Sequence, residues 1–323
     1  MSFARDAKVV LVQRGFPGAF AHRRAAARSE RRLKESNLTA YLMIAPMVVL
    51  LGIFVLWPLG YAIYLSGYRI SFYKPPVWVG TQFYHYVLTD PRFWHSLRVG
   101  LTYSAIVVPI QLAAALALAS FIKTLSGKVA AILKTTVYVP AVISSVIASV
   151  VFVFIYQDAG LANWLVGLLG MKPVAWLNNP GTVLPSVAAP GIWLGFGVAT
   201  LILLAAMLDI PQSYYESASL DGANYFKTMW YITIPLLKNV FLFLVVTGFT
   251  LTVQEFQLPL IMTGGGPVDA TNTPNLYIFN SFRDGTPYAT SFSLAASLLL
   301  FVVLGAISVL IFRLIRSTKA VDG

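Results

Sequence analysis

The sequence has 323 residues, of which 58% are hydrophobic and 11% are charged, and its formal net charge is +11 at pH 7. A soluble chain of this length has too little interior to bury so much apolar surface, so the composition excludes a soluble globular protein and indicates a membrane protein. There are no cysteines and only three histidines, which excludes disulfides, thiolate metal sites and thiol catalysis. We expect no metal site and no bound cofactor.

A basic tail, residues 1–38, opens the chain and carries nine Lys and Arg residues. Its Arg-rich, acid-poor composition is weakly similar to that of an organelle transit peptide. The apolar stretch that follows, Thr39–Ser66, is too long for the core of a signal peptide, and no small-residue cleavage site comes after it. We therefore interpret residues 1–38 as a cytoplasmic tail that fixes the orientation of the first membrane span.

Six apolar stretches are each long enough to cross a hydrocarbon core of ~30 Å as a helix. No 20–50-residue repeat and no inverted pair of interrupted spans is visible among them, which disfavours a secondary transporter. The sequence therefore predicts an all-α fold, a polytopic membrane protein with six transmembrane helices. The predicted spans are Thr39–Ser66, His95–Ile122, Ala130–Tyr156, Ala188–Leu208, Leu236–Thr263 and Thr290–Ile315.

Positive charges are distributed unevenly about these spans. Nine Lys and Arg residues lie in the tail, three between the second and third spans, two beside the loop between the fourth and fifth, and three after the last, which makes 17 of 23 on one side. The positive-inside rule then puts both termini and that loop in the cytoplasm. The basic excess is a topology signal and an affinity for anionic headgroups, and we expect no nucleic-acid partner.

These spans divide the chain into four parts. A cytoplasmic tail, 1–38, is followed by the first span with its external loop, 39–94. The five-helix core, 95–315, contains a loop at residues 209–235, and a short cytoplasmic tail, 316–323, ends the chain. Two more external segments lie within the core, Gln157–Pro185 and Gly264–Ala289, and the first of them begins with a predicted short interfacial helix near Gly160.

The 209–235 loop is a polar island in this apolar chain. Pro211 suits the first turn of a helix, where its missing N–H costs nothing. Gly222 can take a positive φ and so end that helix in a tight turn. A second helix from Asn224 to Ile232 precedes Pro235, which opens the fifth span. The pattern predicts a helix–turn–helix that protrudes into the cytoplasm.

This loop resembles the cytoplasmic loop of binding-protein-dependent ABC importer permeases, which reads Glu-Ala-Ala-x-x-x-Gly and closes with Ile-x-Leu-Pro. Glu216-Ser217-Ala218, Gly222 and Ile232-Thr233-Ile234-Pro235 stand in that register, with Ser217 where alanine is usual. Taken alone, Asp-Gly-Ala would indicate only an ordinary loop with a glycine cap. The resemblance implies that an ATPase couples to Glu216, Ser217, Ala218, Asp221, Gly222 and Ala223.

Similarity to the maltose-type, carbohydrate-uptake branch of these permeases extends across nearly the whole chain. The triple glycine in it is no phosphate cradle, because no strand precedes it and no Lys-Ser or Lys-Thr follows it. The motifs that carry the similarity are Pro46, Pro58-Leu59, Tyr138-Val139-Pro140, Trp193-x-Gly195 and Thr263-Gly264-Gly265-Gly266-Pro267 with Thr271. The resemblance implies the ABC type I importer permease fold, in a bacterial inner membrane.

The same resemblance implies a set of partners and a solute. The partners are a second homologous permease subunit, two ATPase subunits that bind ATP and Mg²⁺, and an extracytoplasmic solute-binding protein. The solute is a sugar, namely an oligosaccharide, a disaccharide or a related polyol. This chain itself would bind no nucleotide and catalyse nothing.

Helical spacing in the fifth span places polar and small residues on one face, from Gly248 to Glu255. A sugar pathway needs such hydroxyl and apolar groups, and in the maltose-type branch the site is formed here and by the Trp-x-Gly segment of the fourth span. The resemblance implies that the pathway is lined by Leu194, Gly195, Val198, Gly248, Leu251, Thr252 and Glu255.

Glu255 has two interpretations. A charge at the centre of a membrane helix costs roughly 2.5–3.5 kcal/mol, so Glu255 should face protein or water. It would there contact the solute, or hydrogen-bond between helices to hold the fold. For Gln111 in the second span we favour the structural interpretation.

Two functions of other classes stay open. An ion channel or secondary carrier would use Glu255 as a proton relay, and its uptake would then be sensitive to ionophores. An intramembrane enzyme would need a catalytic pair in the spans, where Glu255 has no visible His, Asp or Lys partner. We therefore assign no catalytic residue.

Overall fold

The computed structural model describes residues 39–71 and 74–316, so the predicted tail 1–38 and most of the predicted tail 316–323 lie outside the described residues. The described part of the chain divides into two units, one that ends at Tyr64 and one that begins at Leu65. Within the described ranges, five helices are long and apolar enough to cross a membrane, and a bent pair of helices makes a sixth crossing if it is one span. The predicted class, an all-α membrane protein with up to six spans, is confirmed.

The first span is helical from Thr39 to Ser66, with the predicted bounds. It contains a π-helical turn, η1 (Gly52–Leu56), followed by α2 (Trp57–Ser66). The proline ring of Pro58 would clash with the carbonyl four residues earlier in a regular α-helix. The wider π-turn directly before it avoids this clash.

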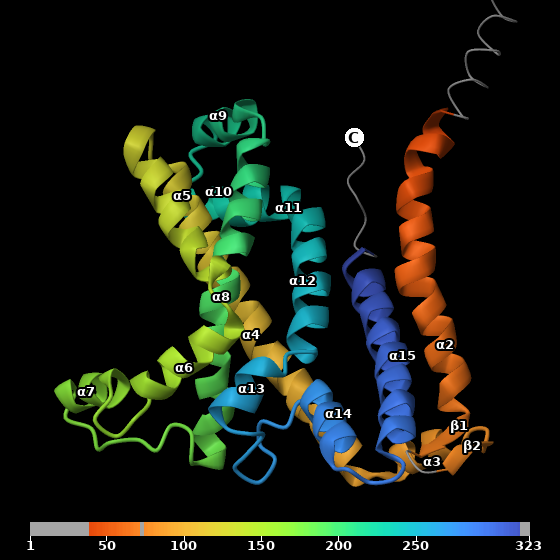
Figure 1. Cartoon of the computed structure of the whole chain (residues 1–323). Coiled ribbons are helices and arrows are strands. Elements are labelled where there is room, and N and C mark those ends of the chain that lie inside the picture. The colour runs from red at the N-terminus through yellow and green to blue at the C-terminus, as the bar shows by residue number, and fades with distance from the viewer. Residues whose placement is uncertain (1–38, 72–73, 317–323) are drawn as a thin grey trace, which may run out of the picture. The chain divides into compact units, whose positions relative to one another are not determined.

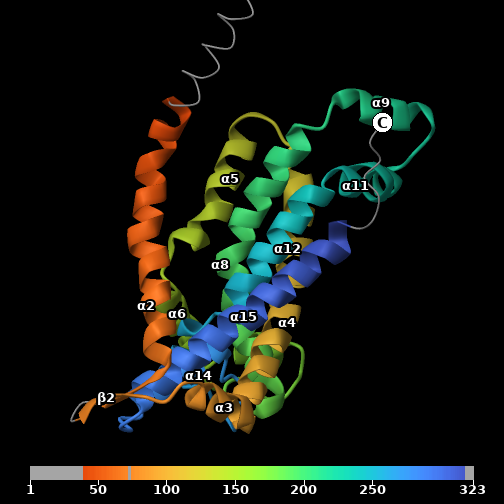
Figure 2. The same ribbon diagram turned by 90° about the vertical axis from the view of Figure 1, so that its right-hand side faces the viewer.

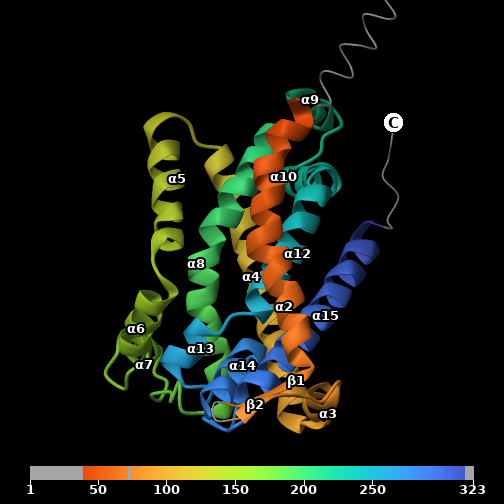
Figure 3. The ribbon, with the colours of Figure 1, turned by 45° about the vertical axis from the view of Figure 1, so that its right-hand side comes forward.

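Three helices form the centre of the second unit: α4 (Pro91–Lys123), α8 (Pro180–Leu208) and α12 (Lys238–Val253). Figures 1 and 3 show α4 and α8 crossing closely, with α12 against α4. α5 (Gly127–Val142) packs on α8 at Gly197, where an added Cβ would clash with the carbonyl oxygen of Val137. α15 (Ala289–Arg316) packs against α12 and α14 (Pro274–Arg283).

The connecting elements of this unit gather at two opposite ends of the bundle, as Figures 1 and 2 show. One end carries α9 (Gln212–Leu220) and α10 (Tyr225–Thr228). The other end carries α14 and four further elements, of which only α7 was predicted. These four are α7 (Leu161–Leu168), α3 (Gln82–Thr89) and the antiparallel strands β1 (Tyr68–Ser71) and β2 (Lys74–Trp78).

A hydrogen bond ties α14 to the start of α4 at this second end. The Tyr277 hydroxyl donates to Oδ2 of Asp90 at 2.8 Å, and Oδ1 of Asp90 accepts from the N–H of Arg92 and so caps α4. Burial, together with the hydrogen bond to Asp90, raises the pKa of Tyr277 above its ordinary value. A tyrosine hydroxyl is protonated at neutral pH even at its ordinary pKa, so Tyr277 is the donor in this bond.

The predicted third span, Ala130–Tyr156, is wrong as a single helix. α5 ends at Val142 and α6 (Ser145–Ile155) leaves it at an angle of 95°. Ile143 and Ser144 are extended, and the Ser144 hydroxyl accepts a hydrogen bond from the Val146 N–H at 3.2 Å. A serine side chain offers the backbone this alternative to continued helix, so the break forms at the serine pair.

The fourth and fifth spans also differ from the prediction. α8 begins at Pro180, not at Ala188, because the Asn179 side chain caps it by accepting from the Gly181 N–H at 2.9 Å. The predicted helix Leu236–Thr263 is divided into α12 and α13 (Gln257–Met262). Two spans are therefore interrupted where no inverted pair of interruptions was visible, and their distal pieces, α6 and α13, pack together.

Candidate coupling loop and solute pathway

Local signals in the 209–235 loop build its first helix, α9. Pro211 precedes α9 with φ −56° and ψ 136°, and Gly222 follows it with φ +70°. The Gly222 N–H donates to the carbonyl of Ser219 at 3.1 Å, and the Ala223 N–H donates to that of Ala218 at 2.9 Å. These two bonds form a Schellman motif, which needs the left-handed conformation that glycine adopts readily. The predicted helix ending at Gly222 is confirmed.

The second half of the loop combines three short helical turns. Asn224 caps α10 by accepting from the Lys227 N–H at 2.9 Å. The π-turn η2 (Met229–Thr233) and α11 (Ile234–Leu236) then lead into α12. η2 precedes Pro235 as η1 precedes Pro58, so the same proline geometry explains both π-turns. The predicted second helix has the expected extent but is not a uniform α-helix.

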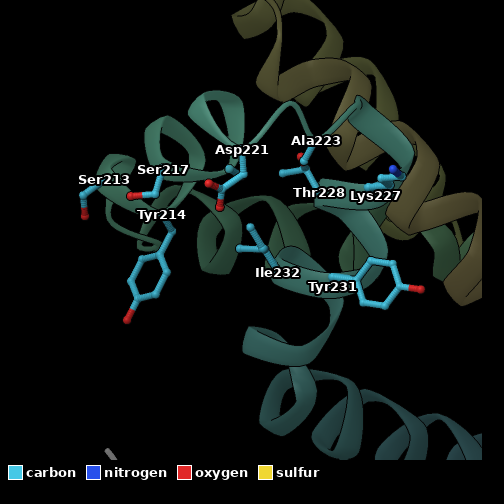
Figure 4. A pocket seen from close by; sticks show the side chains of 10 residues that line it. Ser213, Tyr214, Ser217, Asp221, Ala223, Lys227, Thr228, Tyr231 and Ile232 are labelled. Carbon is cyan, nitrogen blue, oxygen red and sulfur yellow. The ribbon is translucent and has the colours of Figure 1, made fainter.

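The predicted coupling residues lie in α9 and in the turn that follows it. Glu216, Ser217, Asp221 and Gly222 are exposed, Ala223 is half-buried and Ala218 is buried. A groove of about 440 Å³ lies between the two halves of the loop (Figure 4). It is lined from α9 by Ser213, Tyr214, Ser217 and Ala218, from the turn by Asp221 and Ala223, and from α10 and η2 by Lys227, Thr228, Tyr231 and Ile232.

Large apolar side chains of the same loop are exposed. Leu220 is 89% exposed and Tyr231 is 80% exposed, and Phe226 and Trp230 are exposed as well. Clustered exposed apolar groups on a chain mark a surface that meets a partner or lipid. The loop thus presents both a groove and exposed apolar side chains at one end of the bundle.

The predicted pathway residues on α8 and α12 meet at α4. An added Cβ at Gly195 would lie 2.7 Å from Nε2 of Gln111, and one at Gly248 would lie 3.6 Å from Val108. The Thr252 hydroxyl donates to Oγ of Ser104 at 2.9 Å. The amide end of the Gln111 side chain therefore lies against the α8 backbone at Gly195, and it would have to shift if residue 195 carried a Cβ.

The α4 residues in these contacts were not among the predicted lining residues. Ser104, Val108 and Gln111 lie at i, i+4 and i+7 and so share one helix face. The contact of Gln111 with α8 at Gly195 agrees with the structural role predicted for Gln111. Of the predicted lining residues, Leu251 is 68% exposed and Val198 is 40% exposed, so both lie at the surface of the packed helices.

The prediction that Glu255 shares a helical face with Gly248 is wrong, because α12 ends at Val253. The Glu255 carboxylate instead accepts hydrogen bonds from the N–H groups of Gln257 at 2.8 Å and Leu258 at 3.1 Å. These are the first amides of α13, which have no partner within that helix. Glu255 is half-buried and caps the distal half of the fifth span.

α14 and the residue that caps it, Thr273, supply two further hydrogen bonds at this break. The Thr273 hydroxyl donates to the carbonyl of Glu255 at 2.6 Å, and the Asn275 side-chain amide donates to that of Gln254 at 2.8 Å. A groove of about 390 Å³, lined by aromatic and hydroxyl side chains that include Phe256 and Phe279, lies beside it. Among the described residues, no group of three His, Asp or Glu side chains is placed to hold a metal ion.

Two relatives align with nearly the whole chain. The trehalose/maltose transport system permease protein MalF of Thermococcus litoralis is 30% identical over 291 residues, covering 89% of this chain and 97% of that protein. The lactose transport system permease protein LacF of Rhizobium radiobacter is 31% identical over 295 residues, covering 88% and 96%.

A solved structure has the same fold. It is the crystal structure of a bacterial ABC transporter involved in the import of the acidic polysaccharide alginate, with a TM-score of 0.72 and 24% identity, covering 90% of this chain and 100% of that one. The family model for the binding-protein-dependent transport system inner membrane component matches residues 96–319, which include the 209–235 loop and both pathway segments. This chain therefore belongs to the family of inner membrane components of binding-protein-dependent transport systems.

Proposed function

We propose that this chain is a permease subunit of an ATP-driven importer that carries a sugar, namely an oligosaccharide, a disaccharide or a related polyol. It acts with a second, homologous permease, two ATPase subunits and an extracytoplasmic solute-binding protein. Both termini and the 209–235 loop lie in the cytoplasm in this proposal, and the end with α7 and α14 faces outward. ATP is bound and hydrolysed by the partner ATPases.

The observation that carries this proposal is the position of the 209–235 loop. It connects α8 directly to α12, the two helices that bear the predicted pathway residues Gly195 and Thr252. A push on α9 therefore acts on both lining helices at once, which is the rigid-body type of transition that an ATP-driven importer needs. The groove and the exposed apolar side chains of the loop supply a docking surface for a partner.

The names of the relatives support the solute class. MalF is a trehalose/maltose permease, LacF is a lactose permease, and the alginate importer carries an acidic polysaccharide. The carrier alternative relied on Glu255 as a proton relay. The carboxylate of Glu255 accepts hydrogen bonds from two backbone amides, which favours a structural role over proton transfer.

A pull-down from solubilised membranes, followed by an ATPase assay, tests the proposal. We expect the chain to bring with it a second permease and an ATPase, and Gly222→Asp to release the ATPase. The ATPase activity of the reconstituted complex with its binding protein should then rise with a sugar such as trehalose, maltose or lactose, and stay unchanged with amino acids. Recovery of this chain alone, or only as a homo-oligomer, would overturn the importer assignment.

A further inference from the structure

The coupling helix α9 is attached to the bundle by few side chains. Of its residues, all of which are described, only Ala218 is buried. Tyr215 is half-buried, while Glu216 and Leu220 are exposed. A cavity of about 320 Å³, lined by Gln212 and Tyr215 of α9 and by the ends of α4 and α8, separates part of α9 from the spans. The contact at Tyr215 therefore matters for any force that passes between α9 and the bundle.

Lys123 is the side chain that Tyr215 meets. It is the last residue of α4, and its Nζ lies 3.9 Å from the centroid of the Tyr215 ring. The same Nζ donates a hydrogen bond of 3.1 Å to the carbonyl oxygen of Met207, in the last turn of α8. This carbonyl has no intrahelical partner, because it lies beyond the last helical N–H that could reach it.

One ammonium group thus joins three helices. It lies at the negative ends of the α4 and α8 dipoles, where a positive charge is stabilised, and it attracts the electron-rich face of the Tyr215 ring. On the other side of the ring, the Tyr215 hydroxyl lies 3.4 Å from Oγ1 of Thr233, a long hydrogen bond to the buried end of η2. Tyr215 therefore also contacts the segment that leads into α12.

We propose that Lys123 and Tyr215 are positioning residues that transmit the movement of α9 to the cytoplasmic ends of α4 and α8. The inference rests on the proposed importer function. α4 carries Gln111 and α8 carries Gly195, which meet in the predicted pathway, so displacement of their ends reaches the solute face through two rigid helices. The covalent connection at Asp209–Pro211 joins α9 to α8 only. The contact of Lys123 with Tyr215 also joins α9 to α4.

Four substitutions separate this role from simple packing. Lys123→Met keeps the aliphatic stem and removes the charge, and Lys123→Arg restores a cation that can stack on the ring. Tyr215→Leu removes the ring, and Tyr215→Phe keeps the ring and removes only the long bond to Thr233. The native chain has no cysteine, so a single Val198→Cys on the exposed part of α8 reports the state of the pathway through its rate of labelling by a water-soluble maleimide.

The measurement uses the complete complex in nanodiscs, with both permeases, the ATPases and the binding protein, with and without ATP and vanadate. We expect ATP and vanadate to change the labelling rate in the otherwise native chain, and Lys123→Met and Tyr215→Leu to reduce that change about tenfold while the ATPases stay bound and hydrolyse ATP. Lys123→Arg and Tyr215→Phe should retain most of the change in labelling rate that ATP and vanadate cause. The variant that combines Lys123→Met with Tyr215→Leu should respond about as weakly as the worse of the two single variants, because each of them already removes the contact between the ammonium and the ring.

Three outcomes would overturn these conclusions. A native response in Lys123→Met and Tyr215→Leu would show that α9 moves the spans without this contact. Loss of the ATPases from these variants would show that the residues build the docking seat and do not transmit movement. No response in the chain that carries only Val198→Cys would overturn the proposed importer function, and with it the transmission role.

Discussion

The 209–235 loop and the break in the fifth span are both departures from regular α-helix, and they are stabilised differently. The loop is closed by its own residues, through the Schellman bonds at Gly222 and the cap at Asn224. At the break, the Glu255 carboxylate accepts from the first amides of α13. Thr273 and Asn275, at the start of α14, donate to the carbonyls of Glu255 and Gln254. Because its hydrogen bonds are internal, the loop can move as a unit. The break is held in place, because a second helix supplies part of its hydrogen bonds.

The surroundings of the two regions explain this difference. Water can satisfy backbone groups of an exposed loop, so the loop needs few partners from elsewhere in the chain. Irregular backbone within a membrane span has no water to bond and persists only where protein groups satisfy it. We therefore expect substitutions in the loop to affect transport more than stability, and substitutions at the break to affect stability first.

The largest effect is expected for Gly222→Asp. An added Cβ meets no atom within 4 Å, and Asp is among the residues that tolerate positive φ, so the chain should insert and remain folded. Uptake should nevertheless be abolished, because the side chain and its charge occupy the surface that the ATPase covers. Transport assays in vesicles, together with the amount of inserted chain, measure both quantities.

Gly127→Asp is a matched control for this substitution. Gly127 also has a positive φ and open space around it, and it is the first residue of α5, at the same end of the bundle. The complex that contains Gly127→Asp should keep its normal rate of solute uptake. Normal uptake by Gly222→Asp, or equal loss in both variants, would remove the evidence that the 209–235 loop is the seat.

At the break, Glu255→Ala should have the largest effect on stability. It leaves the N–H groups of Gln257 and Leu258 without their carboxylate, which we expect to lower the free energy of unfolding by about 3 kcal/mol. Glu255→Gln keeps one carbonyl acceptor and should lose less than half of that, as thermal unfolding in nanodiscs would show. The ATPases should remain bound in both.

Transport by the same two variants separates the interpretations of Glu255. If the carboxylate only caps α13, Gln restores the uptake of neutral sugars that Ala impairs. If Glu255 contacts the solute through its charge, Glu255→Gln and Glu255→Ala should change the relative uptake of different solutes equally. The break in the fifth span would then bind solute as well as stabilise the fold.

A smaller loss is expected for Thr273→Val, which keeps the shape of the buried side chain. It removes the donor to the Glu255 carbonyl, and an unsatisfied buried acceptor costs about 1–2 kcal/mol. Thr247→Val is the control, because the exposed Thr247 hydroxyl bonds only the Phe243 carbonyl of its own helix. Equal destabilisation by both would contradict the assignment of the break to tertiary hydrogen bonds.

The same contrast explains what could be predicted from the sequence. The helix–turn–helix at 209–235 was predictable because Pro211, Gly222 and Asn224 act within a few residues of their own positions. The bounds of the first span were predictable because an apolar run alone sets them. α4 and α15 were likewise found within a few residues of their predicted ends.

The two breaks differ in how far the sequence could predict them. At the break in the third span the signal is local, because the Ser144 side chain caps α6, although the apolar run continues across it. At the break in the fifth span the partners of Gln254 and Glu255 lie 21 and 18 residues further along, at Asn275 and Thr273. The contact of Gln111 with Gly195 likewise joins two spans. Hydropathy locates spans, and tertiary contacts of this kind cannot be read from it.

Asn224→Ala provides the smallest test and the most local one. It removes the cap of α10, for which the usual cost is about 1 kcal/mol, and Asn224→Ser should restore most of it because serine caps equally well. Because the loop closes on itself, the loss should appear as faster hydrogen exchange at the amides of Lys227 and Thr228, with the unfolding temperature of the bundle unchanged. If exchange were also faster throughout α8 and α12, the loop would not be an independent unit. The loop and the spans would then unfold together.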